Sequence, residues 1–288
     1  MRRFELLEPD SFPAASAALL DHPEAKAIAG GTALLILIKH GVYLPETLVN
    51  LRKIPGMAEI TWDPAAGLRI GALASINDIE RSPLVRQHLP MLAEACHVVA
   101  NIRIRNLATI GGNLSHGDYQ SDPPTALVAL GARVEITRLD ETRELALADF
   151  LLGAYETALE PGELVSAVRV PPPGSGWQST YLKFTTRSSE DRPAVGVAAM
   201  LRLAEGRVSD ARLVVGAVTT TPVRMAEAEA LLRGRSLDAA TLAEVGRLVS
   251  AAIEPIDDIR GSAAYKRRVA GVQAERALQL CSATGGAR

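Results

Sequence analysis

The sequence predicts an α+β protein in two parts that are joined by a linker rich in proline and glycine. The linker reads Pro-Pro-Pro-Gly-Ser-Gly at residues 171–176, a composition typical of a connection between structural units. Before the linker, strand-like and helix-like segments are interleaved, whereas after it three strand-like segments precede three helix-like ones. A run of strands followed by a run of helices favours a sheet with helices on one face. We therefore predict one part at residues 1–175 and a second part at residues 176–288.

Residues 1–55 form the first subdivision that we predict within the first part. Ser11 precedes Pro13, and a serine N-cap followed by proline in the first turn marks the start of a helix. Predicted strands and helices alternate along this stretch, which favours a small sheet with helices packed against it. The order is strand, helix, strand, helix, strand, at residues 4–7, 13–20, 25–29, 33–40 and 47–51.

Residues 56–175 form the second predicted subdivision of the first part. Ser75 and Ser82 mark two further helix starts. Arg103 and Arg105 precede a glycine motif, where each would meet either a phosphate or a surface carboxylate. The predicted strands lie at residues 58–62, 68–72, 133–139 and 164–170, and the predicted helices lie at residues 76–81, 84–100 and 124–130.

The second part, from residue 176 onward, reads as three strands and then three helices. Glu205-Gly206 supplies a turn between the second and third strands. The predicted strands lie at residues 177–186, 194–203 and 208–218, and the predicted helices at residues 225–232, 239–252 and 263–280.

The composition excludes several classes of protein. The chain has 288 residues of which 48% are hydrophobic, enough for a large buried core. A net charge of −2 gives no indication of binding to nucleic acid or to an anionic membrane surface. Cys96 and Cys281 are the two cysteines, whereas an iron–sulfur cluster needs about four thiolates. The low cysteine content and the absence of a stretch of about 20 apolar residues predict a cytoplasmic protein without membrane insertion.

A pair of glycines at residues 111–112 is the strongest candidate for a binding motif. Glycine allows the backbone to approach a ligand, and successive unpaired N–H groups form a concave site for an anion. Thr109 and Asn113 add side-chain donors at the rim, and Asp122 opens the next helix as its N-cap. Amides for a phosphate and a carboxylate for a ribose hydroxyl suit a dinucleotide. The alternative is a tight glycine turn followed by an ordinary capped helix.

A second glycine motif lies upstream, at Ala29-Gly30-Gly31-Thr32. A short strand precedes it and a helix follows it, which is the geometry that receives phosphate. The motif is neither a Walker A loop nor the G-x-G-x-x-G fingerprint. Two glycine motifs in one chain favour a shared dinucleotide more than either motif does alone.

These motifs resemble the FAD-binding medium subunit of the molybdenum hydroxylases, the carbon monoxide dehydrogenase and xanthine dehydrogenase family. The resemblance is carried by Ala29-Gly30-Gly31-Thr32, by residues 104–113 and by Ser121-Asp122-Pro123, and it continues through residues 155–164, 181–184 and 265–268. It implies a two-part FAD-binding domain of the PCMH/vanillyl-alcohol-oxidase type over residues 1–175. Residues 176–288 would then form a CO-dehydrogenase-flavoprotein-like C-terminal domain.

The resemblance also implies roles for particular residues around FAD. The cofactor-binding set that it predicts is Ala29, Gly30, Gly31, Thr32, Thr109, Gly111, Gly112, Asn113, Asp122, Leu164 and Lys183. The two glycine motifs would hold the pyrophosphate, Asp122 would contact the adenosine side, and Leu164 and Lys183 would lie close to the flavin. The alternatives are a core leucine at 164, a solvated strand lysine at 183 and a simple N-cap at 122. The sequence predicts no catalytic residue and no metal ligand.

Two positions, Ala33 and Arg192, depart from the family pattern, and a third residue, His116, has two alternative roles. Ala33 stands where the family usually carries a polar residue, which removes a side-chain contact but leaves the backbone amides. Arg192 stands where some members place an aromatic residue over the flavin ring, so this face is either more open or covered by another residue such as Tyr119. His116 would either link covalently to the flavin or fix the loop by hydrogen bonds, and we favour the second reading.

The implied function is electron transfer within a larger complex. A large molybdopterin-binding subunit would hydroxylate the substrate, a small [2Fe–2S] subunit would carry the electrons, and FAD in this chain would pass them to an external acceptor. The expected assembly is a dimer of heterotrimers. Two alternatives are a self-sufficient flavin-dependent reductase or oxidase and a scaffold that has lost FAD. Lys266-Arg267-Arg268 would be either a docking cluster for a partner or a solvated helix face.

Overall fold

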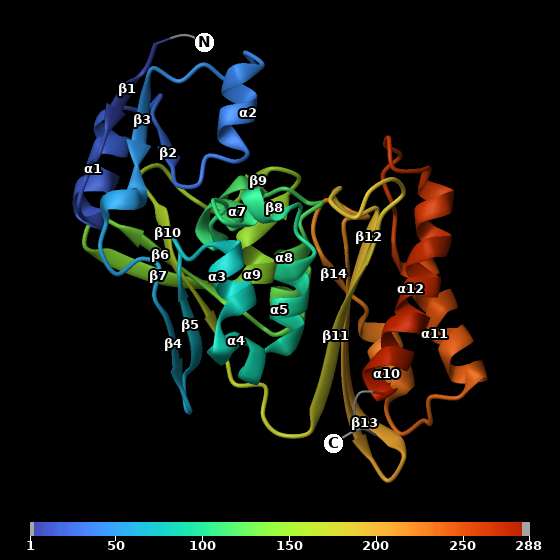
Figure 1. Ribbon diagram of the computed structural model, residues 1–288. Coiled ribbons are helices and arrows are strands. Elements are labelled where there is room, and N and C mark those ends of the chain that lie inside the picture. Colours follow the sequence, from blue (N-terminus) through green and yellow to red (C-terminus); the bar gives the residue numbers. More distant parts are fainter. Residues whose placement is uncertain (1–2, 284–288) are drawn as a thin grey trace.

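Three parallel strands form the N-terminal sheet, in the order β1-β3-β2. The structure is a computed structural model that describes residues 3–283. The strands are β1 (Glu5–Leu7), β2 (Lys26–Ile28) and β3 (Thr47–Asn50), and the connecting helices are α1 (Phe12–Asp21) and α2 (Leu34–Lys39). The chain crosses over β3 through α1 and returns through α2, and the two helices lie on opposite sides of the sheet (Figure 1). The predicted alternation of strands and helices is confirmed.

The second sheet is antiparallel and has the order β4-β5-β10-β6-β7. Its edge strand β4 follows the short 3₁₀ turn η1 (Leu51–Lys53), which itself follows β3 of the first sheet. β10 is the central strand and carries almost continuous buried residues, as a strand covered on both faces should. The strands are β4 (Ile60–Asp63), β5 (Gly67–Gly71), β6 (Arg133–Arg138), β7 (Glu141–Ala146) and β10 (Leu164–Val170).

A group of short helices packs beside this sheet and carries the second glycine motif (Figure 1). The helices are α3 (Ile76–Arg81), α4 (Pro83–His88), α5 (Pro90–His97), α6 (Ile102–Arg105), α7 (Ile110–His116), α8 (Asp122–Ala129) and α9 (Leu147–Phe150). A small hairpin, β8 (Leu151–Gly153) with β9 (Glu156–Thr157), lies close to α7.

The single helix predicted over residues 84–100 is wrong, because the chain breaks at Leu89. Leu89 has φ −137° and ψ 57°, and it separates α4 from α5. Pro90 follows it at the first position of α5. Proline has no N–H to continue the first helix and disfavours helical backbone in the residue before it, so one helix becomes two.

The C-terminal sheet is antiparallel, with the order β11-β12-β13-β14, and α11 and α12 cover one of its faces (Figure 1). α5 and α8 of the first part pack against the other face. The predicted turn at Glu205-Gly206 is confirmed, and both residues have positive φ. The elements are β11 (Trp177–Phe184), β12 (Val195–Ala204), β13 (Arg207–Gly216), β14 (Val223–Arg224), α10 (Ala226–Leu232), α11 (Ala239–Ala252) and α12 (Ala263–Ala283).

β12 connects two hydrophobic cores through its alternating faces. Val195, Val197 and Leu201 point to the core beneath α11 and α12, whereas Ala198 and Met200 join the core of the first part. The C-terminal sheet is therefore a middle layer that fixes the position of the first part.

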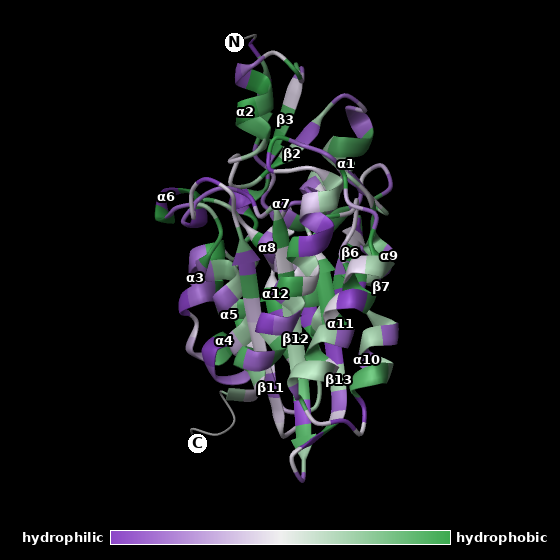
Figure 2. Cartoon of the chain, turned by 90° about the vertical axis from the view of Figure 1, so that its right-hand side faces the viewer, coloured by the Kyte–Doolittle hydropathy of each residue, from purple (hydrophilic) through white to green (hydrophobic). Residues whose placement is uncertain are grey.

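α2, beside the N-terminal sheet, is largely hydrophobic in Figure 2, although Ile38 is its one buried residue. No helix within residues 3–283 is both long enough and apolar enough to cross a membrane.

Candidate functional site

The fold brings the two glycine motifs into direct contact. A Cβ atom on Gly30 would lie 1.9 Å from the carbonyl oxygen of Leu107, far inside any real contact distance. Glycine at this position therefore allows the first motif to rest on the backbone that leads into Thr109. Residues about 80 positions apart in the sequence thus form one continuous backbone surface.

The first motif presents backbone N–H groups that the protein leaves unpaired. Within residues 3–283, the amides of Gly30, Gly31, Thr32 and Ala33 donate no hydrogen bond. All four residues are partly exposed, and Gly31 has a φ of +70° that favours glycine. A cluster of unpaired amides at a partly exposed turn offers hydrogen bonds to an anionic ligand.

The second motif differs from its prediction, because its glycines lie in the first turn of α7 and its amides are occupied. Thr109 is the N-cap, and its hydroxyl accepts a hydrogen bond of 3.1 Å from the Gly112 amide. The amides of Ile110 and Gly111 donate to the carbonyl oxygens of Ala74 and Ala72. The expectation of unpaired N–H groups at this motif is therefore wrong, since the N-cap and the neighbouring chain satisfy them.

The two glycines of this motif have different reasons to lack a side chain. A Cβ on Gly111 would lie 2.5 Å from Cβ of Ala72, so Gly111 is needed for packing. Gly112 is exposed, and a Cβ there would meet only the Thr109 hydroxyl, at 3.0 Å. Packing therefore does not require a glycine at position 112, whereas the close approach of a ligand would require one. The side chain of Asn113 next to it is held by the Ser121 hydroxyl at 2.8 Å.

Asp122 is the first residue of α8, and Ser121 precedes it as the N-cap, so the predicted N-cap is one residue too late. Its carboxylate is buried and accepts hydrogen bonds from the Tyr181 hydroxyl at 2.8 Å and from Nζ of Lys183 at 3.1 Å. These protein partners occupy the carboxylate that the resemblance places at the adenosine side.

Lys183 is not the solvated strand residue of the alternative reading, because its side chain is only 5% exposed. Its ammonium group also donates to the Val98 carbonyl oxygen at 2.7 Å. Lys183 therefore links β11 to α8 and to the end of α5. Leu164 opens β10 and is 5% exposed, within the core of the first part.

Burial raises the pKa of Asp122 to about 6, against the opposing effects of Lys183 and Tyr181. The carboxyl group therefore binds its proton more readily in the folded chain than in the unfolded one, where the pKa is near 3.9. The stability linked to this group is complete below about pH 4 and is lost as the pH rises to about 6.

We predict that Asp122→Asn removes this pH dependence. The free energy of unfolding of the unsubstituted chain, measured relative to Asp122→Asn, should fall by roughly 3 kcal/mol between about pH 3 and pH 7. Urea unfolding at several pH values measures this difference. A difference that stays constant over the range would contradict the assignment.

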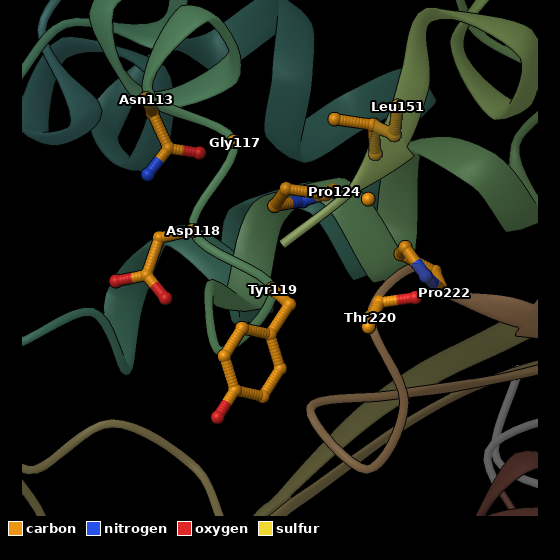
Figure 3. Close-up of a pocket in the computed structure, with 9 residues that line it drawn as sticks. Asn113, Gly117, Asp118, Tyr119, Pro124, Leu151, Thr220 and Pro222 are labelled. Carbon is orange, nitrogen blue, oxygen red and sulfur yellow. The ribbon is translucent and has the colours of Figure 1, made fainter. Parts of the chain in front are cut away.

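A small pocket lies where the two parts of the chain meet (Figure 3). Asn113 and Asp118 lie on one side of it, and Thr220 and Pro222, from the loop after β13, lie on the other. We call it the Tyr119 pocket. It is lined by Asn113, Gly117, Asp118, Tyr119, Pro124, Leu151, Gly153, Thr220 and Pro222.

Arg192 and Tyr155 complete the surroundings of this pocket. Nε of Arg192 donates to the Asp118 carboxylate, and half of the arginine side chain remains exposed. Tyr155 has a φ of +61°, and its ring makes edge contacts with His116 and Tyr119 at centroid distances of 5.2 and 6.4 Å. His116 therefore packs against an aromatic ring, and its burial lowers the pKa of its imidazole.

The docking cluster considered at Lys266-Arg267-Arg268 is wrong for its first member. Lys266 is fully buried, and Nζ donates to Asp258 at 2.8 Å and to the Ile256 carbonyl oxygen at 2.8 Å. Asp258 also accepts from Gln120, so this ion pair anchors the start of α12 to the loop before α8. Arg105 pairs with the carboxylate of Glu80 at 2.9 Å, so it meets a carboxylate, but a buried one and not the surface carboxylate that was considered for it.

Sequence reasoning missed Asp118, Thr220 and Pro222 as pocket residues. Asp118 lies two positions after His116, but a single aspartate in a polar loop carries no distinguishing signal. Thr220 and Pro222 reach the pocket because β13 packs on α8, a contact between segments about 90 residues apart. Local sequence patterns do not encode such an approach.

Comparison with known proteins identifies the class of the chain. Residues 2–173 match the model of the FAD binding domain in molybdopterin dehydrogenase, and residues 180–280 match that of the CO dehydrogenase flavoprotein C-terminal domain. The chain is 34% identical over 281 residues to the carbon monoxide dehydrogenase medium chain of Afipia carboxidovorans, with 97% of each covered. It is 29% identical over 271 residues to the putative xanthine dehydrogenase FAD-binding subunit of Escherichia coli, covering 94% of this chain and 93% of that one.

The solved structures agree with these relatives. Carbon monoxide dehydrogenase from Hydrogenophaga pseudoflava, in a form that lacks the Mo-pyranopterin moiety, aligns with a TM-score of 0.93 and 34% identity over 98% of each chain. The chain thus carries the FAD-binding fold of a molybdopterin-dependent oxidoreductase. It belongs to the family of FAD-binding medium subunits of the molybdenum hydroxylases. The family, the α+β fold class and FAD as the cofactor were predicted from the sequence and are confirmed.

Proposed function

We propose that this chain is the electron-transfer subunit of a molybdenum hydroxylase, which receives electrons from iron–sulfur clusters of a partner and passes them to an external acceptor. The observation that carries the proposal is the row of unpaired amides at Gly30–Ala33, seated on the backbone of Leu107. The proposed partners are a large molybdopterin-binding subunit and a small [2Fe–2S] subunit, in a dimer of heterotrimers. The names of two relatives, a carbon monoxide dehydrogenase medium chain and a nicotine 6-hydroxylase medium subunit, support an assembly of several subunits.

The first glycine motif fits the diphosphate of FAD. The amides from Gly30 to Ala33 would donate to phosphate oxygens, and hydrogen bonds to a charged acceptor are among the strongest in proteins. Ala29 would extend this surface at the strand end. Because the backbone supplies the donors, the alanine at position 33 does not remove the site.

The second motif would contact the same diphosphate in a different way. Gly112 would let the ligand approach the first turn of α7, which Gly111 fixes against Ala72. Thr109 and Asn113, held by Gly112 and Ser121, would form the rigid edge of this surface. FAD supplies the redox chemistry, while the protein supplies binding and orientation.

Asp122, Leu164 and Lys183, the other residues predicted to bind FAD, would hold in place the elements that form the binding surface. Lys183 fixes the start of α8 through Asp122 and the end of α5 through Val98. We propose that Lys183 and Asp122 are positioning residues for this face, and that Leu164 supports it from the core beneath. A buried ion pair with three hydrogen bonds holds such a surface in one arrangement.

The chain's own cysteines support an external source of electrons. Cys96 and Cys281 are both fully buried. Burial raises the pKa of Cys96 and raises that of Cys281 to about 12, so neither thiol ionises near neutral pH. Since thiolates are the ligands of iron–sulfur clusters, a partner subunit would have to supply the clusters.

The test of FAD binding is the visible spectrum of the purified chain. We expect a yellow protein that releases FAD on denaturation. A colourless protein that also fails to bind added FAD would contradict the proposal. Release of FMN in place of FAD would contradict the diphosphate site on the glycine motifs.

We predict that Gly112→Val weakens FAD binding more than it weakens folding. A β-branched side chain would stand on the exposed surface that the ligand approaches, while the contact with Thr109 needs only a small shift. We expect at least a tenfold loss of FAD affinity, measured by quenching of flavin fluorescence, with less than about 1 kcal/mol lost in urea unfolding. Unchanged affinity would show that Gly112 serves only the helix.

A further inference from the structure

Two arginine side chains lie against the ring of Trp177, far from the two glycine motifs. The guanidinium carbons of Arg202 and Arg212 lie 4.9 and 5.4 Å from the centroid of the indole ring. Trp177 opens β11 and pairs with Arg202 of β12, and Arg212 lies on the next strand, β13. We call these three residues the Trp177 cluster. In Figure 1, β11 begins near the lower end of the molecule, whereas β2 and α7, which adjoin the glycine motifs, lie in its upper half, so the cluster is separate from the surface proposed to bind FAD.

The positive charge of this cluster has no carboxylate partner within residues 3–283. The Arg202 side chain makes no hydrogen bond or ion pair with these residues, and its Nε is buried without a partner. Arg212 donates to the carbonyl oxygen of Ala129 at 3.1 Å, at the C-terminal end of α8, and makes no ion pair within the same residues. Asp210 lies opposite Arg202 in the sheet but pairs with Arg233 at 3.4 Å. Two guanidinium groups on one indole ring therefore leave excess positive charge that an anion from solution would balance.

The linker between the two parts of the chain passes directly over the cluster. A Cβ atom on Gly174 would lie 3.4 Å from a terminal nitrogen of Arg202, and one on Gly131, just after α8, would lie 3.6 Å from a terminal nitrogen of Arg212. The backbone amides of residues 174–176 are exposed and donate no hydrogen bond to the part of the chain that the structure describes. Gly174 has a φ of +80°, and successive N–H groups in such a turn form a concave site for an anion. Unpaired amides and unpaired guanidinium groups thus lie side by side.

The free donors of the cluster suit a phosphate ion. Of the three guanidinium nitrogens of Arg202, Nε is the one that the protein buries without a partner, so the two terminal nitrogens are those that a ligand can reach. A planar guanidinium group donates two parallel hydrogen bonds to a phosphate. Phosphate has further oxygens to which the linker amides can donate. A carboxylate has only two oxygens, both of which the guanidinium group would use, so phosphate suits more of the donors.

We propose that the Trp177 cluster and the linker amides bind a phosphate ion. Arg202 would donate from its terminal nitrogens, Arg212 would add a second positive charge, and the amides of residues 174–176 would donate from the linker. The bound ion would tie the linker to the C-terminal sheet, at the point where the two parts of the chain join. This inference does not depend on FAD binding, because the cluster shares no residue with the glycine motifs.

The first test follows the phosphorus NMR signal of inorganic phosphate as the chain is added. We expect the unsubstituted chain to broaden the signal with a dissociation constant of about 1 mM, and Arg202→Gln to weaken binding at least tenfold. Arg202→Lys keeps the charge but loses the planar fork, so it should weaken binding several-fold. Arg247→Gln, at an exposed position on α11, is the matched control and should bind phosphate normally. Excess FAD in every sample keeps phosphate off the amides of Gly30–Ala33, and any phosphate that still binds there would affect all variants equally.

The second test measures urea unfolding in phosphate and in chloride of equal ionic strength. Phosphate stabilises proteins in general because it is excluded from their surface, so the comparison between variants isolates the bound ion. At about 10 mM phosphate the folding equilibrium constant should rise about tenfold in the unsubstituted chain and in Arg247→Gln, and less than twofold in Arg202→Gln. Arg202→Lys decides the question if Arg202→Gln fails to fold. An equal rise in all chains, a phosphorus signal that broadens as much with the Arg202 variants as without them, or no broadening at all would overturn the inference.

Discussion

Gly30→Ala should reduce FAD affinity at least 100-fold. The new Cβ would lie 1.9 Å from the Leu107 carbonyl oxygen, and real contacts of this kind stay beyond 3.0 Å. The two glycine motifs must therefore separate by more than an ångström, which withdraws the amides of the first motif from a diphosphate held by the second. Hydrogen bonds to charged groups contribute about 1.5–3 kcal/mol each, so losing two of them gives a loss of at least that size.

The matched control for this substitution is Gly41→Ala. Gly41 has a φ of +71°, so alanine there is strained by roughly 1–2 kcal/mol, but its Cβ would point into open space. Calorimetric titration with FAD, together with urea unfolding, separates the two effects. We expect the control to lose stability and keep FAD. Normal FAD affinity in Gly30→Ala would mean that the contact between the motifs does not shape the site.

Lys183→Met should destabilise the chain by about 3–5 kcal/mol, the usual cost of removing one partner from a buried ion pair. The substitution leaves the buried carboxylate of Asp122 with the Tyr181 hydroxyl as its remaining partner and leaves the Val98 carbonyl oxygen without its lysine donor. Because Lys183 links β11 to α8 and α5, the contact between the two parts of the chain should loosen with it.

The control is the double variant Lys183→Met with Asp122→Asn. It removes both charges while keeping the approximate volume of each side chain, so it should recover a large part of the lost stability. Urea unfolding of the two variants and the unsubstituted chain measures the coupling. A single variant that loses less than 1 kcal/mol would show that the pair is not a structural link.

Local signals in the sequence were sufficient for most of the secondary structure. Glu205-Gly206 was correctly predicted as a turn, and the helix predicted over residues 239–252 has the observed bounds of α11. The break at Leu89-Pro90 was missed because apolar spacing continues across it, although proline alone could have revealed it.

The candidate site was harder to predict, because its properties depend on contacts between distant segments. Both glycine motifs were recognised, but only the fold shows that Gly30 rests on Leu107 and that the amides of Gly111 and Gly112 are already used. Asp122 and Lys183 were each singled out without any indication that they pair with one another. Burial and pairing of charges are tertiary properties, so periodicity does not reveal them.

We expect this chain to receive electrons from a partner and not to oxidise an organic substrate itself. The most direct test follows the visible flavin absorbance under anaerobic conditions, in the isolated FAD-loaded chain and in the complex with its co-purified partners. The substrates are a panel of N-heterocycles, aldehydes and carbon monoxide. We predict that a substrate of the complex bleaches the flavin in the complex and leaves the isolated chain unchanged. Bleaching of the isolated chain by one of these substrates would contradict the account and indicate a self-sufficient flavoenzyme.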